Sequence, residues 1–108
     1  MNKDEKALLI ALEVGDFPRA NGRILRTLNV LSGRWIRLSA MREALHDIED
    51  IDRSLIYLER GEYIKARNIE TRKTIEIEYA NNHECEVALT TKGMDILCYA
   101  IENPSIEV

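Results

Sequence analysis

Hydrophobic residues recur at helical spacing in two consecutive segments, residues 39–48 and 51–60. In the first segment the apolar positions follow i, i+3, i+4 and i+7, and Ser39 is placed to cap a helix. These positions are Met41, Ala44, Leu45 and Ile48. The second segment repeats the spacing with Ile51, Leu55 and Leu58. The pattern predicts two short helices joined by a tight turn.

The outward face of the second predicted helix carries mixed chemistry. Advancing 100° per residue from Ile51 places five residues opposite the apolar stripe. They are Glu49, Arg53, Ile56, Tyr57 and Arg60. If residues 39–60 form a helix-turn-helix, this face meets the partner. The arginines and the tyrosine suit DNA, whereas Asp47, Asp50 and Asp52 around the helix start do not.

Two further helices are predicted before this pair. Residues 3–14 contain the run Ala7 to Leu12, which is apolar nearly all round and indicates burial on more than one side. Residues 15–22, with Pro18 and two glycines, are typical of a connector. A second helix then begins near Asn21 and ends before Gly33.

Alternating and β-branched residues predict four strands. A short strand at residues 34–38 includes Trp35, which we expect in the core. Longer strands follow at residues 63–69, 74–79 and 84–90, and together they form a hairpin region over 62–90. Its tip is Glu70 to Lys73. The basic side chains of this region are Lys65, Arg67, Arg72 and Lys73, and the acidic ones are Glu76, Glu78, Glu84 and Glu86.

A last helix is predicted over residues 90–103, stopped by Pro104 and followed by a frayed tail at 104–108. One apolar stripe on this helix consists of Met94, Leu97, Cys98 and Ile101. A second consists of Ile96, Tyr99 and Ala100. Two apolar sides, together with the apolar run near the N-terminus, predict a homodimer through the terminal helices.

Charge is unevenly distributed along the 108 residues. Acids outnumber bases 19 to 15, for a net charge of −4, so bulk electrostatics gives no general attraction to nucleic acid. From Phe17 to Arg42, however, there are six arginines and no acid. The N-terminus lacks a signal-peptide pattern, and no apolar run spans a bilayer. We expect one soluble, cytoplasmic domain.

Catalytic and metal-binding patterns are missing from the sequence. His83 and Cys85 lack the third and fourth ligands that zinc requires. There is no Gly-rich phosphate loop and no nucleophile elbow. Cys85 and Cys98 have no metal or redox spacing and are expected to be free thiols in the core. We therefore expect no enzyme activity, no metal and no cofactor.

Two stretches resemble the winged helix-turn-helix superfamily. LIYLERGEYI resembles its L-x-x-L-E-x-x-G-L-I junction between recognition helix and wing, although Glu62 takes the place of the usual glycine and Gly61 precedes it. VALTTKGMDIL resembles its L-T-x-K-G-x-x-L-L entry to the last helix. The resemblance covers roughly residues 21–101, and RILRTLNVLSGRWIRLSAMREAL looks most like small winged-helix proteins of phages and prophages.

This resemblance implies an α+β, mainly helical, winged-helix domain over residues 1–103, with residues 39–60 as the helix-turn-helix and 62–90 as the wing. It implies a recognition helix in the major groove of double-stranded DNA, with Arg53, Tyr57 and Arg60 in contact. Arg72 and Lys73 at the wing tip would reach the adjacent backbone. Arg37, Ser39 and Arg42 at the helix entry would bind phosphates.

The sequence thus predicts a DNA-binding transcription regulator. The alternative is a protein-binding winged helix, such as a phage inhibitor of a host protein, in which the mixed face of the second helix docks on its target. Imitation of DNA by the acidic surface is a weaker third possibility, because the carboxylates form no single array.

Overall fold

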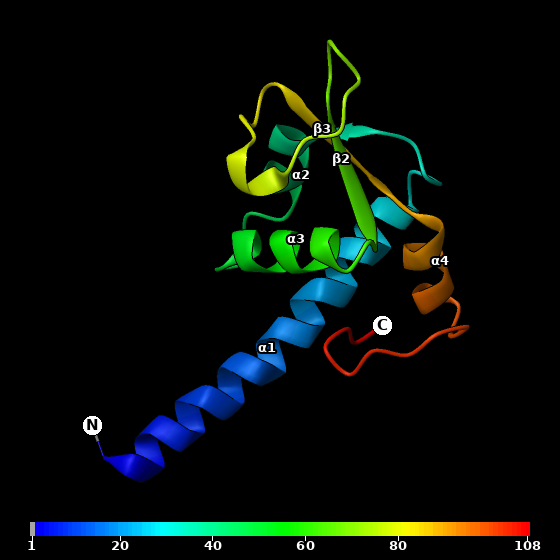
Figure 1. Cartoon of the computed structure of the whole chain (residues 1–108). Coiled ribbons are helices and arrows are strands. Elements are labelled where there is room, and N and C mark those ends of the chain that lie inside the picture. Colours follow the sequence, from blue (N-terminus) through cyan, green and yellow to red (C-terminus); the bar gives the residue numbers. More distant parts are fainter. Residues whose placement is uncertain (1) are drawn as a thin grey trace.

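The computed structural model describes the backbone of residues 2–108 and the side chains of residues 2–5 and 16–108. This part of the chain forms five helices and a small antiparallel sheet of three strands, and it is roughly 45% helical (Figure 1). The expected α+β class is confirmed. The elements in chain order are α1 Lys3–Asn29, β1 Ile36–Arg37, α2 Leu38–Ala44, α3 Ile51–Arg60, β2 Ile64–Asn68, the 3₁₀ helix η1 Ile77–Tyr79, β3 Cys85–Leu89 and α4 Thr91–Leu97.

Helix α1 is one continuous element, so the predicted connector at residues 15–22 and the division into two helices are wrong. Pro18 lies inside this helix, where proline normally breaks the backbone pattern. The C-terminal segment packs against this part of α1: Glu107 N donates to Pro18 O at 2.9 Å, and Asn21 Nδ2 donates to Ser105 O at 2.8 Å. Tertiary contacts thus outweigh the local breaking signals.

Gly22 explains why the C-terminal segment can approach α1 so closely. A Cβ atom at this position would lie only 1.7 Å from Glu107 O. Ile106 beside this contact is buried, so the tail predicted to be frayed is folded back along α1 (Figure 1). The glycine that suggested a connector is instead the docking position for residues at the far end of the chain.

The two central helices largely match their predictions. Helix α3 has the expected bounds, and Leu55 and Leu58 are fully buried. Helix α2 begins two residues earlier than expected, because Arg37 rather than Ser39 is the N-cap, without a side-chain capping bond. It also ends at Ala44, so Ile48 packs on the core from the following turn.

The sheet has the order β1-β3-β2, with Ile36 opposite Val87 and Ile64 opposite Leu89. β1 is only two residues long because α2 begins at once. The strand predicted at residues 74–79 is wrong: Thr74 makes an isolated bridge to Arg67, and the chain then turns into η1.

The junction between α3 and β2 has its left-handed residue where the superfamily places glycine. Gly61 has an ordinary φ of −78°, whereas Glu62 has a φ of 66°. Thr90 Oγ1 donates to Glu62 O at 2.6 Å and also accepts from Gly93 N at 3.1 Å, which caps α4. One threonine therefore ties this turn to the start of the last helix.

Helix α4 ends at Leu97, well before the predicted residue 103, and Tyr99 follows in a left-handed conformation with a φ of 65°. Ile96 is its core residue, whereas Cys98 is exposed, so the predicted position of Cys98 in the core is wrong. Cys85 is buried as expected, and burial raises the pKa of its thiol. None of the helices in the described residues is long and apolar enough to cross a membrane.

Candidate functional site

Two residues of α3 that were predicted to contact DNA, Arg53 and Tyr57, pack against α1. The Arg53 guanidinium carbon lies 4.4 Å from the centre of the Phe17 ring. Tyr57 meets the same ring edge-on at 5.2 Å, and its hydroxyl accepts a hydrogen bond of 2.8 Å from Asn103 Nδ2. Tyr57 is half-buried against α1 and the C-terminal segment, so its predicted outward orientation is wrong. Sequence periodicity gave no sign of Phe17 as a neighbour.

Two arginines of α2 and α3, Arg42 and Arg60, are paired with acids. Arg60 pairs with Glu78 at 3.1 Å. Arg42 pairs with Asp52 and also donates to Asn82 Oδ1 at 2.8 Å. The ion pairs among the described residues are Arg19–Glu107, Arg23–Asp47, Arg42–Asp52, Arg60–Glu78 and Arg67–Glu86. Three of the six arginines in the locally basic stretch, Arg19, Arg23 and Arg42, are therefore paired with acids.

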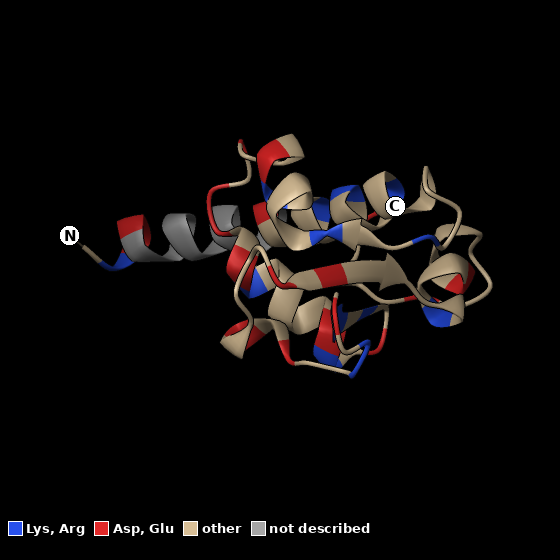
Figure 2. Ribbon diagram, turned by 90° about the horizontal axis from the view of Figure 1, so that it is seen from above, with Lys and Arg blue, Asp and Glu red and all other residues tan. Residues whose placement is uncertain are grey.

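The Arg23–Asp47 pair joins α1 to the turn between α2 and α3. Their hydrogen bond lowers the pKa of Asp47 and raises the pKa of Arg23. Both groups lie at the surface, where such a pair contributes little to stability. Figure 2 shows that Lys and Arg positions are interspersed with Asp and Glu positions along the ribbon.

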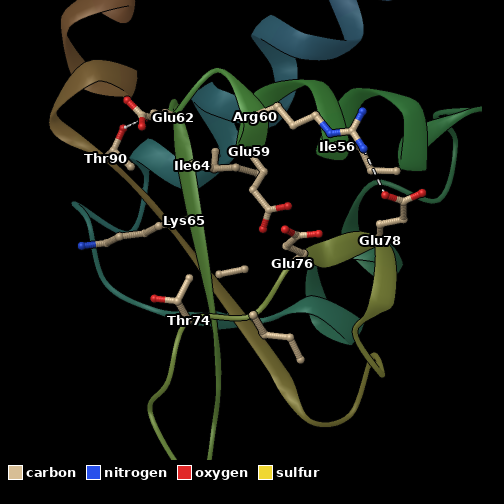
Figure 3. Close-up of a pocket in the computed structure, with 12 residues that line it drawn as sticks. Ile56, Glu59, Arg60, Glu62, Ile64, Lys65, Thr74, Glu76, Glu78 and Thr90 are labelled. Atoms are coloured by element: carbon tan, nitrogen blue, oxygen red, sulfur yellow. Dashed lines mark hydrogen bonds and ion pairs between the residues drawn. The ribbon is translucent and has the colours of Figure 1, made fainter.

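A groove of about 410 Å³ lies between α3, β2 and residues 74–78 (Figure 3). Its apolar lining comes from Ile56, Ile64, Ala66 and Ile75. Its acidic lining comes from Glu59, Glu62, Glu76 and Glu78, against which stand two bases, Arg60 and Lys65. The described residues include no cluster of His, Cys, Asp or Glu suited to a metal ion. The lining of the groove is therefore both apolar and acidic.

Glu59 is the carboxylate most affected by this environment. Both of its carboxylate oxygens accept from Ile77 N at 3.1 Å, so it holds η1 against α3. Burial raises the pKa of Glu59, the charge of Glu76 adds to the rise, and the Ile77 hydrogen bond opposes it. Glu59 and Glu76 lie close together in Figure 3.

The outer face of the sheet carries a different set of charges. The register places Arg37, Glu86 and Arg67 in one row across the three strands. The Trp35 ring centre lies 3.9 Å from the Arg67 guanidinium carbon and 5.2 Å from Lys65 Nζ. Trp35 is half-buried beneath these cations. The prediction that Trp35 is enclosed in the core is therefore wrong.

The hairpin tip continues this face and projects from the body of the molecule (Figure 1). The Asn68 side chain accepts from the backbone N–H of Glu70 and Thr71 at 2.9 and 3.0 Å, and Arg72 has a φ of 60°. Arg72 and Lys73 are exposed. We call Trp35, Arg37, Lys65, Arg67, Arg72 and Lys73 the strand-and-tip surface.

Most cations of the strand-and-tip surface lack an acidic partner. Among the described residues only Arg67 of this set forms an ion pair, with Glu86. Glu70 and Glu84 also lie in the hairpin, and Lys65 also lines the groove that holds Glu59, Glu62, Glu76 and Glu78. The sequence had already placed Lys65, Arg67, Arg72 and Lys73 on one basic side. It did not reveal that Arg67 and Lys65 lie over the Trp35 ring, or that Arg37 lies in the same row as Arg67.

The predicted contacts thus separate into two groups. Arg37, Arg72 and Lys73 lie on the strand-and-tip surface, whereas Arg42, Arg53, Tyr57 and Arg60 are engaged by α1, acids or the C-terminal segment. Ser39 lies in the first turn of α2, partly buried. The chain matches no family model, and no curated protein or solved structure gave a match to it.

Proposed function

We propose that the chain is a winged-helix protein that binds double-stranded DNA to regulate transcription, and that its strand-and-tip surface makes the principal phosphate contacts. The order α1-β1-α2-α3-β2-β3 and the strand order β1-β3-β2 support the winged-helix assignment. In this assignment α2 and α3 form the helix-turn-helix, and β2 with β3 forms the wing. The three-stranded sheet joins both parts.

The observation that carries the proposal is the contrast between paired and unpaired cations. Phosphate binding depends on cations that neutralise the DNA backbone and release its counterions. Arg37, Lys65, Arg72 and Lys73 have no ion-pair partner among the described residues, whereas Arg42 and Arg60 do. A cation that is not already neutralised by a neighbouring carboxylate attracts phosphate more strongly.

Helix α3 has a secondary part in this proposal. Exposed ion pairs are worth only about 0 to 1 kcal/mol, so Arg60 can exchange Glu78 for a phosphate once the wing is bound. Glu49 and Asp52 oppose such contact. We expect Arg53→Ala and Arg60→Ala to weaken binding less than changes at the tip, and Glu49→Gln with Asp52→Asn to tighten it.

The test is a salt titration of binding to a fluorescent duplex taken from the region upstream of the protein's own gene. Arg72→Gln with Lys73→Gln removes two tip charges, and Arg19→Gln with Arg34→Gln is a control with the same change in net charge. Each lost phosphate contact reduces the slope of log K against log salt by about 0.9, so the tip variant should lose nearly two units. The control should keep the wild-type slope.

Equal slopes for both variants would contradict a role of the tip. Failure of the wild-type protein to bind the duplex even at low salt would remove DNA binding altogether and favour the protein-binding alternative, in which Ile56 and Tyr57 act as apolar anchors.

A further inference from the structure

Trp35 is the only tryptophan of the chain, and its side chain reaches from one edge of the sheet to the other. It immediately precedes β1, whereas Lys65 and Arg67 belong to β2, and the strand order β1-β3-β2 puts β3 between them. The centre of the indole ring nevertheless lies 5.2 Å from Lys65 Nζ and 3.9 Å from the Arg67 guanidinium carbon. The Trp35 side chain therefore crosses over β3 to meet these two cations.

Ala88 is the position of β3 over which the ring passes. The register pairs Ala88 with Lys65, and the pairing of Ile36 with Val87 places Trp35 on the other side of Ala88. Ala88 shares the outer face with exposed Lys65, yet it is fully buried. A large side chain must cover it, and the Trp35 ring is placed to do so. The small alanine side chain leaves room for this crossing.

An aromatic face holds a cation in a different way from a carboxylate. The indole ring attracts a cation through its quadrupole, and it does so better than the rings of Tyr or Phe. The ring has no net charge, so the cation keeps its charge for a third group. A carboxylate at ion-pair distance instead opposes that charge, as Glu78 does for Arg60. Trp35 therefore orders cations without neutralising them.

Lys65 depends on the ring more than Arg67 does. Lys65 is exposed and has no ion-pair partner among the described residues, so the ring is the contact that orders its ammonium group. Arg67 Nε also donates to Glu86 Oε1 at 2.6 Å. This bond uses one of the five N–H donors of the guanidinium group. Within the described part of the chain, Arg67 Nη1 and Nη2 make no hydrogen bond, which leaves them available to a phosphate oxygen.

We propose that Trp35 is a positioning residue for DNA binding, which holds the Lys65 ammonium and the Arg67 guanidinium side by side so that both bind phosphate oxygens of the backbone. A long side chain that is already ordered loses less conformational entropy when it binds. Trp35 acts through these two cations and not through a contact of its own with DNA. The inference rests on the proposed DNA binding and explains how two side chains of the strand-and-tip surface are set for it.

Two substitutions separate the aromatic face of Trp35 from its bulk. Leucine still covers Ala88 but has no π system, whereas phenylalanine keeps an aromatic face. With the same fluorescent upstream duplex, Trp35→Leu should weaken binding about three- to tenfold, and Trp35→Phe should retain most of the wild-type affinity. In the free protein, NMR should show upfield ring-current shifts of the Lys65 Hε and Arg67 Hδ protons. Trp35→Leu should remove these shifts, and Trp35→Phe should keep part of them.

A double-mutant cycle tests whether Trp35 acts through the cations. The second background combines Lys65→Gln, Arg67→Gln and Glu86→Gln, in which the last change avoids an unpaired carboxylate. Loss of two phosphate contacts should itself reduce the slope of log K against log salt by about 1.8. In this background, at low salt, Trp35→Leu should alter the affinity less than twofold. Urea unfolding of each variant checks that it is folded.

The outcomes distinguish this inference from the proposed function. If the wild type binds the duplex, the inference alone is overturned by unaltered binding of Trp35→Leu, or by an equal loss in Trp35→Phe and Trp35→Leu. An equal effect of Trp35→Leu in both backgrounds, an unaltered salt slope in the second background, or wild-type spectra without the ring-current shifts would overturn it as well. Failure of the wild type to bind at low salt would overturn both, because Trp35 would then have no phosphate contact to support.

Discussion

Gly22→Ala tests the docking of the C-terminal segment on α1. At an ordinary helix interior this change stabilises a protein by about 0.5 to 1 kcal/mol, because alanine is the better helix former. Here the new Cβ would lie 1.7 Å from Glu107 O and 2.6 Å from its carbonyl carbon. Both atoms belong to the backbone, so no side-chain rotation relieves the overlap.

The expected magnitude follows from what the C-terminal segment must give up. Overpacking of a close contact costs about 1 to 3 kcal/mol. If the segment moves away instead, it exposes Ile106, whose burial is worth about 1.5 to 3 kcal/mol. It also loses the bonds from Glu107 N to Pro18 O and from Asn21 Nδ2 to Ser105 O. Regained chain freedom offsets part of this loss. We expect a net destabilisation of about 1 to 2 kcal/mol.

Urea unfolding of four proteins gives the answer: wild type, Gly22→Ala, Ile106→Asp, and the double variant. Ile106→Asp should release the segment, since an unpaired charge is not tolerated in that buried position. In the released background Gly22→Ala should stabilise the protein by about 0.5 to 1 kcal/mol. A stabilising effect in the intact chain, or the same destabilisation in both backgrounds, would refute the docked arrangement.

Four other predictions concern the core, the thiols, pH and assembly. Leu55→Ala should cost about 2 to 5 kcal/mol in the same urea assay, and a loss under about 0.5 kcal/mol would mean that the register of α3 is wrong. A maleimide reagent should label exposed Cys98 in the native protein and buried Cys85 only after unfolding; equal rates would contradict the packing of β3. Because the pKa of Glu59 is raised on folding, its contribution to stability is present below the unfolded-state pKa of about 4.3 and is lost as pH rises through the folded pKa. The unfolding free energy of Glu59→Gln should therefore rise relative to that of wild type as the pH increases above about 4, and a constant difference would count against the raised pKa. For assembly, light scattering at high micromolar concentration should give twice the chain mass. A monomer mass would contradict the homodimer. The run Ala7 to Leu12, on which that prediction rests, lies outside the described side chains.

The predicted homodimer contact needs one revision in its C-terminal half. Ile96, which was assigned to an outward stripe, is a core residue of α4. Tyr99 from the same stripe is exposed, and it follows the helix rather than lying on it. The exposed apolar side chains at this end are therefore Met94 on α4 and Tyr99 in the turn after it.

Local pattern was sufficient for the elements whose signal is contained in their own residues. The spacing of Ile51, Leu55 and Leu58 gave the bounds of α3, and alternation located β2 and β3 to within one residue at each end. Thr90 was recognised at the start of the last helix and does cap it. Periodicity and capping depend on neighbours within about four residues, so a sequence reports them directly.

Only the tertiary structure decided that α1 is continuous, that residues 74–79 form no strand and that Arg23 and Arg42 are paired with acids. Pro18 and Gly22 signal a break locally, but α1 continues because residues 105–107 dock there, 84 positions away in the case of Asn21 and Ser105. TIEIEY alternates like a strand, but the Glu59 carboxylate accepts a hydrogen bond from Ile77 N, and the segment turns away from β2. Arg23 and Arg42 are neutralised by acids 24 and 10 residues distant. Pairings between separated residues depend on how the elements pack, and a local pattern of residue types does not specify them.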